Sequence, residues 1–308
     1  MIASYGFGQE HPFGQDRHDV FHDELERSNL SDQVVFTKAF HASKDELLSY
    51  HTDEYIEFVK KSCSNGLGFL DDGDTPAIKG LFESASYVVG ATLSMVNAIM
   101  AQQARFAFVP IGGLHHAFRD HAAGFCVFND AGIAIEILRN QYGLKRIAYV
   151  DIDAHHGDGI FYAFEHDPLI FIADIHEDGR ALFPGTGHKS ESGKGDAVGT
   201  KLNIPLKPRA NDNDFYLAWE RIEAFVDACA PEFILFQCGA DSIEGDPITH
   251  LRFSSEAHAY AAKRLCYLAT RHASGRLLAM GGGGYNRKNL AKGWTSVVRE
   301  LVNFSDVD

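Results

Sequence analysis

The sequence predicts an α/β protein with a three-layer α/β/α arrangement, in which helices cover both faces of a mostly parallel sheet. Two observations favour this class: short apolar runs rich in β-branched and aromatic residues, and longer stretches of helical periodicity between them. Strands buried on both faces and separated by helices are typical of parallel sheets. A third observation concerns size, because 308 residues that are 45% hydrophobic can form one large core. The chain contains no repeat and no long linker, so we expect a single domain over residues 1–308.

Five apolar runs are the expected strands. They are "RFAFVPI" at 105–111, "RIAYVDID" at 146–153, "LIFIADI" at 169–175, "FILFQCGAD" at 233–241 and "RLLAMGGGG" at 276–284. Between and after them, helical periodicity predicts helices at about 79–103, 130–142, 212–228, 255–272 and 287–302.

Four of the expected strands run into polar or glycine-rich sequence. These endings are "GGLHH", "DIDAHHGDG", "GADS" and "GGGGY". In open α/β sheets the ligand binds beyond the carboxyl ends of the strands. We therefore expect the four endings to converge at one edge of the sheet and to form an active site there.

Composition excludes several classes of protein. The chain has 28 basic and 42 acidic residues, a net charge of −14, which disfavours a nucleic-acid partner and suits cationic ligands. The N-terminus lacks a signal-peptide pattern and no apolar run approaches eighteen residues, so we expect a cytoplasmic protein without a membrane segment. The five cysteines are scattered and never form C-x-x-C, which argues against disulfides and against a thiolate zinc site.

The segment "DIDAHHGDG" is the first candidate for chemistry. If the strand stays extended, Asp151, Asp153 and His155 lie on one face, and carboxylate oxygen with imidazole nitrogen suits zinc. Asp241, at the end of another strand, is the expected third ligand. The alternative for Asp158 or Asp241 alone is a helix N-cap. Burying several unpaired carboxylates costs several kcal/mol each, so the cluster as a whole favours a metal site.

The endings "GGLHH" and "GGGGY" add acid–base groups. His115 and His116 are adjacent after a glycine turn, and carboxylates such as Asp151 and Asp158 could fix their tautomers. Tyr285 follows four glycines, where a phenol could donate a hydrogen bond to a developing oxyanion. Taken alone, the glycine run could equally be a flexible turn.

Seven segments, in order along the chain, resemble the zinc-dependent histone deacetylase family, whose bacterial members include acetoin-utilisation proteins and acetylpolyamine amidohydrolases. They are "HPFGQDR" (11–17), "GGLHHA" (112–117), "GFCVFND" (124–130), "DIDAHHGDG" (151–159), "FPGTG" (183–187), "QCGADSIEGDP" (237–247) and "GGGGY" (281–285). The resemblance implies the arginase-like α/β/α fold and hydrolysis of an N-acetyl amide.

The resemblance also implies roles for individual residues. Zinc would bind Asp153, His155 and Asp241. His116 would be the general base and His115 its companion, supported by Asp158 and Asp151 respectively, while Tyr285 would polarise the acetyl carbonyl. The expected substrate channel consists of Gly124, Phe125, Phe183 and Gly283, with Ile248 at its mouth.

Four further expectations follow from the same resemblance. Arg17 would lie near an internal cavity, with a surface salt bridge as the alternative. Among Asp71, Asp72 and Asp74, Asp74 is preferred as the rim residue that holds the substrate backbone, with an acidic loop of no substrate role as the alternative. Potassium would bind near the zinc through Asp151, Asp153 and His155, with Asp174 where relatives often carry serine. A second monovalent-ion site would use Phe164, Asp167, Ile170 and Thr200.

The implied substrate is an acetylated lysine in a protein or peptide, or an acetylated polyamine. Polyamine-specific relatives tend to carry a glutamate near the channel mouth, whereas this chain has Ile248, which favours acyl-lysine. Two other classes stay open. A binuclear manganese ureohydrolase would need further bridging carboxylates, but His156 follows "DIDAH". A non-catalytic acyl-lysine binding module would have no need of both histidines and Tyr285. The sequence predicts neither acyl-chain preference nor oligomeric state.

Overall fold

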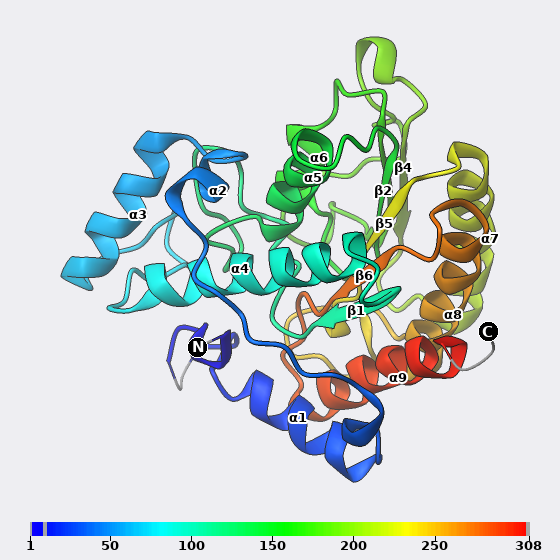
Figure 1. Cartoon of the computed structure of the whole chain (residues 1–308), viewed down its shortest axis with the longest axis horizontal. Helices are drawn as coiled ribbons and strands as arrows, with labels where there is room; N and C mark the ends of the chain where they lie inside the picture. Colours follow the sequence, from blue (N-terminus) through cyan, green and yellow to red (C-terminus); the bar gives the residue numbers. More distant parts are fainter. Residues whose placement is uncertain (1, 9–10, 306–308) are drawn as a thin grey trace.

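The structure, a computed structural model, describes residues 2–8 and 11–305. Within that range its centre is a six-stranded sheet in the order β1-β6-β5-β2-β3-β4, with every pair parallel (Figure 1). The strands are β1 (Phe106–Val109), β2 (Ile147–Asp151), β3 (Ile170–Glu177), β4 (Lys201–Leu206), β5 (Phe233–Gln237) and β6 (Leu277–Met280). The predicted fold class is confirmed.

Helices cover both faces of this sheet. On one side lies α4 (Leu81–Met100), with α5 (Asp130–Asn140) and α6 (Asp158–Ala163) beside it; on the other lie α7 (Asp212–Cys229), α8 (Ser255–His272) and α9 (Arg287–Ser305) (Figure 1). Helix α1 (Arg17–Arg27) packs against α9, and α2 (Lys44–Leu48) precedes α3 (Asp53–Asn65). The short 3₁₀ helix η4 (Ala240–Ser242) follows β5.

The five expected helices all form, and their ends are set by local chemistry. The side chain of Asn211 caps α7 in a reciprocal pair with Asp214, and Ser254 caps α8 by accepting from the Glu256 N–H. Strand β4 was not among the expected strands. It is an edge strand that contains Pro205, and proline is tolerated in a sheet mainly at such edges.

The polar tails of three expected strands are not strand, which corrects the prediction. Strand β2 ends at Asp151, because the Asp151 carboxylate accepts the Asp153 N–H at 3.0 Å and turns the chain. Strand β5 ends in the same way, where the Gln237 side chain accepts the Gly239 N–H at 2.7 Å. Strand β6 ends at Met280, before the glycines. Asp151, Asp153 and His155 therefore do not share one face of an extended strand.

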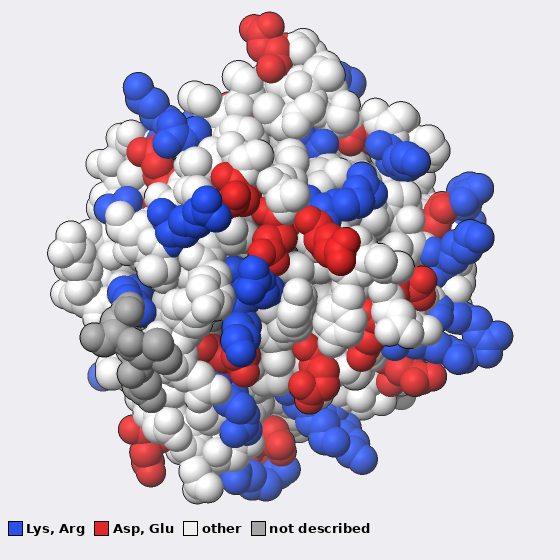
Figure 2. Space-filling model, turned by 90° about the vertical axis from the view of Figure 1, so that its right-hand side faces the viewer, with Lys and Arg blue, Asp and Glu red and all other residues white. Residues whose placement is uncertain are grey.

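Charged side chains are distributed without a dominant patch of one sign on the face seen in Figure 2. Basic and acidic side chains are interspersed there over the elements on the right of Figure 1. Among residues 2–8 and 11–305, no helix is both long enough and apolar enough to cross a membrane.

Candidate metal centre and active site

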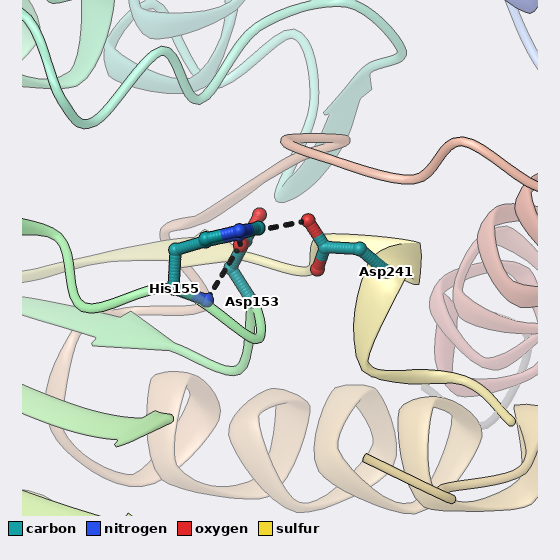
Figure 3. Close-up of side chains that lie close together, drawn as sticks. All are labelled: Asp153, His155 and Asp241. Carbon is teal, nitrogen blue, oxygen red and sulfur yellow. Dashed lines mark hydrogen bonds and ion pairs between the residues drawn. The ribbon is translucent and has the colours of Figure 1, made fainter. Parts of the chain in front are cut away.

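Asp153, His155 and Asp241 form a buried cluster of potential metal ligands. One ligand atom from each residue lies within 4.8 Å of the other two. Asp153 and His155 come from the loop after β2, and Asp241 comes from η4 after β5, so the two loops face each other across neighbouring strands (Figure 3). The three side chains that the sequence predicts as ligands are brought together.

Hydrogen bonds hold both carboxylates of this cluster in place. Asp153 Oδ2 accepts from the Gln237 side chain and from the Gly283 N–H, each at 2.9 Å. Asp241 Oδ1 accepts the Ala154 N–H at 2.9 Å, so Asp241 is not a helix cap. Asp241 Oδ2 is buried without a hydrogen-bond partner among the described residues, and His155 Nδ1 lies 3.2 Å from it without hydrogen-bond geometry.

The electrostatics of this cluster favour a cation. Burial by itself lowers the pKa of His155, but the carboxylates of Asp153 and Asp241 outweigh burial and raise that pKa to about 10. A metal ion would displace the proton and would satisfy Asp241 Oδ2. Two carboxylates and one imidazole are ligands that zinc accepts, and three protein ligands leave a position open for substrate or water. The residues therefore fit a catalytic metal ion.

Two glycines allow the ligands to approach the backbone. A Cβ at Gly283 would lie 2.0 Å from Asp241 Oδ2, and a Cβ at Gly239 would lie 2.0 Å from Asp153 Oδ2. Any other residue at either position would therefore displace a metal ligand. Gly283, which the sequence analysis assigns to the channel, lies directly against the candidate metal ligands.

His115 and His116 form a linked pair beside the metal cluster. His115 Nδ1 donates to Asp151 Oδ2 at 2.8 Å, and His116 Nδ1 donates to Asp158 Oδ1 at 2.6 Å. Their two Nε2 atoms are 3.1 Å apart, so one proton is shared between them. Each imidazole thus has the carboxylate partner that the resemblance implies. Tyr149 donates a further hydrogen bond to Asp151 Oδ2 at 2.7 Å.

The two imidazoles have opposite protonation states. Burial lowers the pKa of His115, but Asp151 and Asp153 outweigh burial and raise it to about 9. Burial and the charge on His115 lower the pKa of His116 to about 4, against the opposing effect of Asp158. At neutral pH His116 is uncharged and its Nε2 can accept a proton, as a general base requires.

Tyr285 is held near the carboxylates of Asp241 and Asp153 as a neutral phenol. Burial, with the carboxylates of Asp241 and Asp153, raises the pKa of the Tyr285 hydroxyl well above its usual value, so it stays a hydrogen-bond donor. Its ring contacts Phe13 and Phe125 edge-on, at centroid distances of 6.4 and 5.9 Å. The Tyr285 N–H donates to Asp246 Oδ2 at 2.8 Å.

The Arg287–Asp16 ion pair holds the backbone carbonyl of Tyr285. Arg287 donates to both carboxylate oxygens of Asp16 at 2.7 and 2.8 Å, and its third nitrogen donates to the Tyr285 carbonyl at 3.1 Å. The backbone N–H and C=O of Tyr285 are therefore both restrained.

Sequence reasoning gave no individual role to Gln237, Asp130 and Asp246, although each lies in a quoted segment. Gln237 holds Asp153, as described above. Asp130 accepts from the N–H groups of Gly113 and Leu114 at 2.8–3.0 Å and so fixes the turn that delivers His115. Asp246 joins the loop of Ile248 to the loop of Tyr285. Each of the three is a polar residue near a buried strand or helix end, and this position was the only sign of a role. The role itself could not be predicted, because the hydrogen-bond partners lie on other elements.

The predicted channel residues surround His116 and Tyr285. Gly124 lies between His116 and Phe183, because a Cβ on it would be 2.5 Å from His116 Cδ2 and 3.0 Å from Phe183 Cε1. The Phe183 ring is 5.1 Å from the His116 ring and its residue is 46% exposed, so it lies at the surface above the imidazole. Phe125 packs against Tyr285, and half-buried Ile248 donates its N–H to Asp246 at 3.1 Å.

The aspartates of the 71–74 loop differ in their contacts. Asp71 Oδ1 accepts three backbone N–H groups, from Gly73, Asp74 and Thr75, at 2.9–3.0 Å, so this carboxylate shapes the loop itself. Asp74 is exposed, and Thr75 next to it accepts the Phe125 N–H at 3.1 Å. The Thr75 hydroxyl donates to Asp71 Oδ2 and lies 3.5 Å from Asp74 Oδ1, so Asp71 shapes the loop beside the predicted channel and Asp74 remains its exposed carboxylate.

Arg17 is fully buried, which excludes the surface salt bridge considered as an alternative. It donates to the carbonyls of Gly284 at 2.9 Å and Gly282 at 2.6 Å, and its guanidinium lies 3.9 Å from the centre of the Phe13 ring. Arg17 therefore supports the glycine run that carries Tyr285.

The residues expected at the potassium sites have other partners. Asp174 pairs with Asp151 across β3 and β2, and its carboxylate accepts from His176 at 2.6 Å and from the Gly157 N–H at 3.0 Å. At the expected second site the structure places the ammonium group of Lys201, which donates to the carbonyls of Asp167 and Ile170.

His156 points away from the metal cluster. Its Nδ1 lies 2.9 Å from Thr186 Oγ1, and its ring lies 5.0 Å from the ring of His176. It therefore does not supply a ligand for a second metal ion next to the first, as a binuclear centre would need.

Comparisons with known proteins agree with this geometry. A family profile described as the histone deacetylase domain matches residues 11–301. An acetoin utilization protein, AcuC, of Bacillus subtilis is 38% identical over 97% of this chain and 79% of its own length. The histone deacetylase clr6 of Schizosaccharomyces pombe is 30% identical over 96% of this chain and 73% of its own length. The crystal structure of the HDA15 HD domain superposes with a TM-score of 0.89 at 25% identity, covering 97% of this chain and 85% of that one.

Proposed function

The chain belongs to the histone deacetylase family, and on that premise we propose that it is a zinc-dependent amidohydrolase that removes acetyl or other short acyl groups from N-ε-acyl-lysine in proteins or peptides. The observation that carries the proposal is the convergence of Asp153, His155 and Asp241 beside a neutral His116. A zinc ion bound by the three ligands would polarise the amide carbonyl and lower the pKa of a neighbouring water.

In the proposed reaction His116 and Tyr285 act on opposite sides of the amide carbon. His116 Nε2 takes a proton from the attacking water as the new C–O bond forms, and Tyr285 donates a hydrogen bond to the developing oxyanion. The C–N bond then breaks, and the proton held by the histidine pair passes to the leaving amine. The products are a carboxylate and the free lysine side chain.

His115 has a supporting part in this scheme. Its pKa of about 9 keeps it protonated at neutral pH, and the Asp151 carboxylate holds its ring. The pair therefore carries one positive charge before water is deprotonated, which stabilises the negative charge of the tetrahedral intermediate. Asp158 accepts the His116 Nδ1 proton and so fixes the tautomer in which Nε2 carries no proton of its own.

The proposed substrate enters past Gly124, Phe125 and Phe183. Two aromatic rings beside a glycine suit an extended aliphatic stem, and the exposed Asp74 is our candidate for holding the substrate backbone. Apolar Ile248 near the Tyr285 loop favours acyl-lysine over a polyamine, whose charged amines would require an acidic partner there. The proposal includes a potassium ion near Asp151 and Asp174, and a cytoplasmic location, where the five free cysteines would stay reduced.

Turnover of a fluorogenic acetyl-lysine peptide, measured beside acetylspermidine, tests the proposal. We expect cleavage of the peptide that is lost with a chelator and restored by zinc, with one zinc bound per chain. The His155→Ala variant should bind no zinc and should not respond to zinc addition. Cleavage of acetylspermidine alone would move the function to polyamine deacetylation. Two manganese ions per chain would favour a ureohydrolase, and peptide binding without turnover would favour a binding module.

A further inference from the structure

Lys201 is a buried lysine that, among residues 2–8 and 11–305, donates hydrogen bonds to three neutral oxygen atoms and forms no ion pair. It begins the edge strand β4 and is 2% exposed. Its Nζ donates to the carbonyl of Asp167 at 3.0 Å, to the carbonyl of Ile170 at 2.6 Å and to Thr200 Oγ1 at 2.8 Å. The three protons of the ammonium group thus have three acceptors. The Thr200 hydroxyl donates its proton to the Ala197 carbonyl at 2.7 Å. Its oxygen therefore accepts the hydrogen bond from Lys201.

This arrangement differs from a buried salt bridge. The carboxylate nearest in sequence to the site belongs to Asp167, but it accepts from Arg139 at 2.7 Å and from the Leu169 N–H at 2.9 Å. Burial lowers the pKa of Lys201 to about 8, and the Asp167 carboxylate opposes that effect only partly. At pH 7 the group is therefore still mostly protonated. Lysine is almost never fully buried without a charged partner, so the three neutral acceptors are the unusual feature of this site.

Backbone carbonyls and a hydroxyl are the ligands that proteins offer to a potassium ion. The resemblance described above implies a second monovalent-ion site at Phe164, Asp167, Ile170 and Thr200, and three of these four residues provide the oxygen atoms around Lys201 Nζ. The Lys201 ammonium group already occupies the space between these oxygen atoms. A potassium ion bound by the same oxygens would collide with it and would be repelled by its charge. The residues present therefore do not fit a second potassium ion.

We propose that the Lys201 ammonium group is a tethered replacement for a monovalent cation, and that it makes this site independent of dissolved potassium. It fastens the loop between α6 and β3 to the start of β4, where Lys201 pairs with Ile172 in the sheet. A tethered cation is always present, whereas a free ion must bind from solution. The inference does not rest on the proposed activity.

Two variants of the full chain separate the charge of Lys201 from its volume. Lys201→Ala removes the ammonium group and opens space for an ion among the oxygens, whereas Lys201→Met removes the charge but keeps the side chain. The melting temperature of each protein is measured from 1 to 100 mM KCl at pH 7, with tetramethylammonium chloride holding the ionic strength constant. The wild type provides the potassium response of the rest of the molecule, including the site proposed near Asp151.

We expect both variants to melt below the wild type at 1 mM KCl. Lys201→Ala should then regain on the order of 5 °C more than the wild type as potassium rises, because an ion that binds only the folded chain raises its stability. Lys201→Met should respond no more than the wild type. An equal potassium response in all three proteins, or equal rescue of both variants, would overturn the proposal.

A second measurement covers the case in which Lys201→Ala does not fold. Crystals of the wild type are soaked in thallium(I), which replaces potassium and scatters anomalously. The proposal predicts no thallium peak among the carbonyls of Asp167 and Ile170 in the wild type. A thallium peak at that position, with the Lys201 side chain displaced, contradicts it directly. The same soak of a folded Lys201→Ala crystal should show a new peak there.

Discussion

At the scale of single residues, burial and neighbouring charge decide what each group can do. His115 and His116 are adjacent in sequence, yet their pKa values are about 9 and about 4, because only His115 faces two carboxylates. Tyr285 is half-buried near the carboxylates of Asp241 and Asp153, and desolvation of its hydroxyl together with these charges raises its pKa and keeps it protonated. One imidazolium, one neutral imidazole and one phenol are thereby fixed within one site.

Tyr285→Phe tests the role of the phenol. We expect kcat to fall by about 10² to 10³ because one oxyanion donor is removed. Tyr142→Phe is the matched control, since the Tyr142 hydroxyl bonds Asn97 on the exposed surface. Steady-state kinetics on the acetyl-lysine peptide and thermal melting of both variants provide the comparison. Retention of full kcat in a folded Tyr285→Phe protein would remove Tyr285 from the mechanism.

At the scale of elements, the loops after the strands are rigid because side chains from other elements hold them. The loop after β6 is restrained by Asp246 from the loop after β5 and by Arg287 at the start of α9. The turn after β1 is held by Asp130 at the start of α5. Tyr285 and His115, which we propose to act in the reaction, therefore each depend on an anchor from another element of the fold.

Arg287→Met tests the anchor of the Tyr285 loop. Loss of the bond to the Tyr285 carbonyl should loosen the phenol and lower kcat by roughly 10-fold to 100-fold, since small displacements of catalytic groups are costly. KM should change little, and the variant should have no further effect in a Tyr285→Phe background. Arg264→Met, which breaks a comparable pair with Glu223, is the control and should leave kcat unchanged. Additive losses in the double variant would contradict a positioning role.

The buried His51, between α2 and α3, should make the free energy of unfolding fall as the pH is lowered. Its Nε2 accepts the Asn129 N–H at 3.0 Å, and burial lowers its pKa to about 3. The folded state thus binds fewer protons than the unfolded state between pH 3 and the ordinary histidine pKa of about 6.5. This contribution to stability is complete above that upper value and is lost as the pH falls toward 3.

The His51→Gln variant isolates this contribution, because glutamine can accept the same N–H without titrating. Between pH 7 and pH 5 the free energy of unfolding of the wild type should fall by about 2 kcal/mol more than that of the variant. Urea unfolding at the two pH values measures the difference. Parallel losses in the two proteins would show that His51 does not set the acid response.

At the scale of the whole molecule, the net negative charge of the chain is the property that bears on substrate capture. The chain carries a net charge of −14, although basic and acidic groups are interspersed on the face seen in Figure 2. Such a field attracts cationic substrates over distances that salt screens, with a Debye length of about 10 Å at 0.1 M. Lysine-rich peptides and polyamines both carry the complementary charge.

The ionic-strength dependence of KM tests this long-range attraction. For an acetyl-lysine peptide flanked by lysines, KM should rise several-fold between 50 and 500 mM salt, because screening weakens the encounter. A peptide of the same length with serine in place of the flanking lysines should show a nearly constant KM. Equal responses of the two peptides would mean that the net charge has no part in substrate capture.

Much of this architecture is determined by sequence alone. Apolar runs locate five of the six strands, and helical periodicity of apolar residues locates the five helices that cover the sheet. Both patterns work because they reflect which side chains are buried. The polar endings of β2, β5 and β6 identify Asp153, His155, Asp241 and Tyr285, because such groups are costly at buried strand ends unless they have partners. Helices α1, α2, α3 and α6 and the edge strand β4 are not among the predicted elements.

Only the tertiary structure decides which residues meet. The turn at Asp151 takes Asp153 and His155 off the strand, and Gln237, Gly239 and Gly283 from two other strands set where they lie. The family resemblance likewise implies a free ion among Phe164, Asp167, Ile170 and Thr200, whereas the fold brings the Lys201 ammonium group there from β4. The physical reason is the same in both cases: a local pattern reports whether a residue is buried, but hydrogen bonds and charge depend on partners that are distant along the chain.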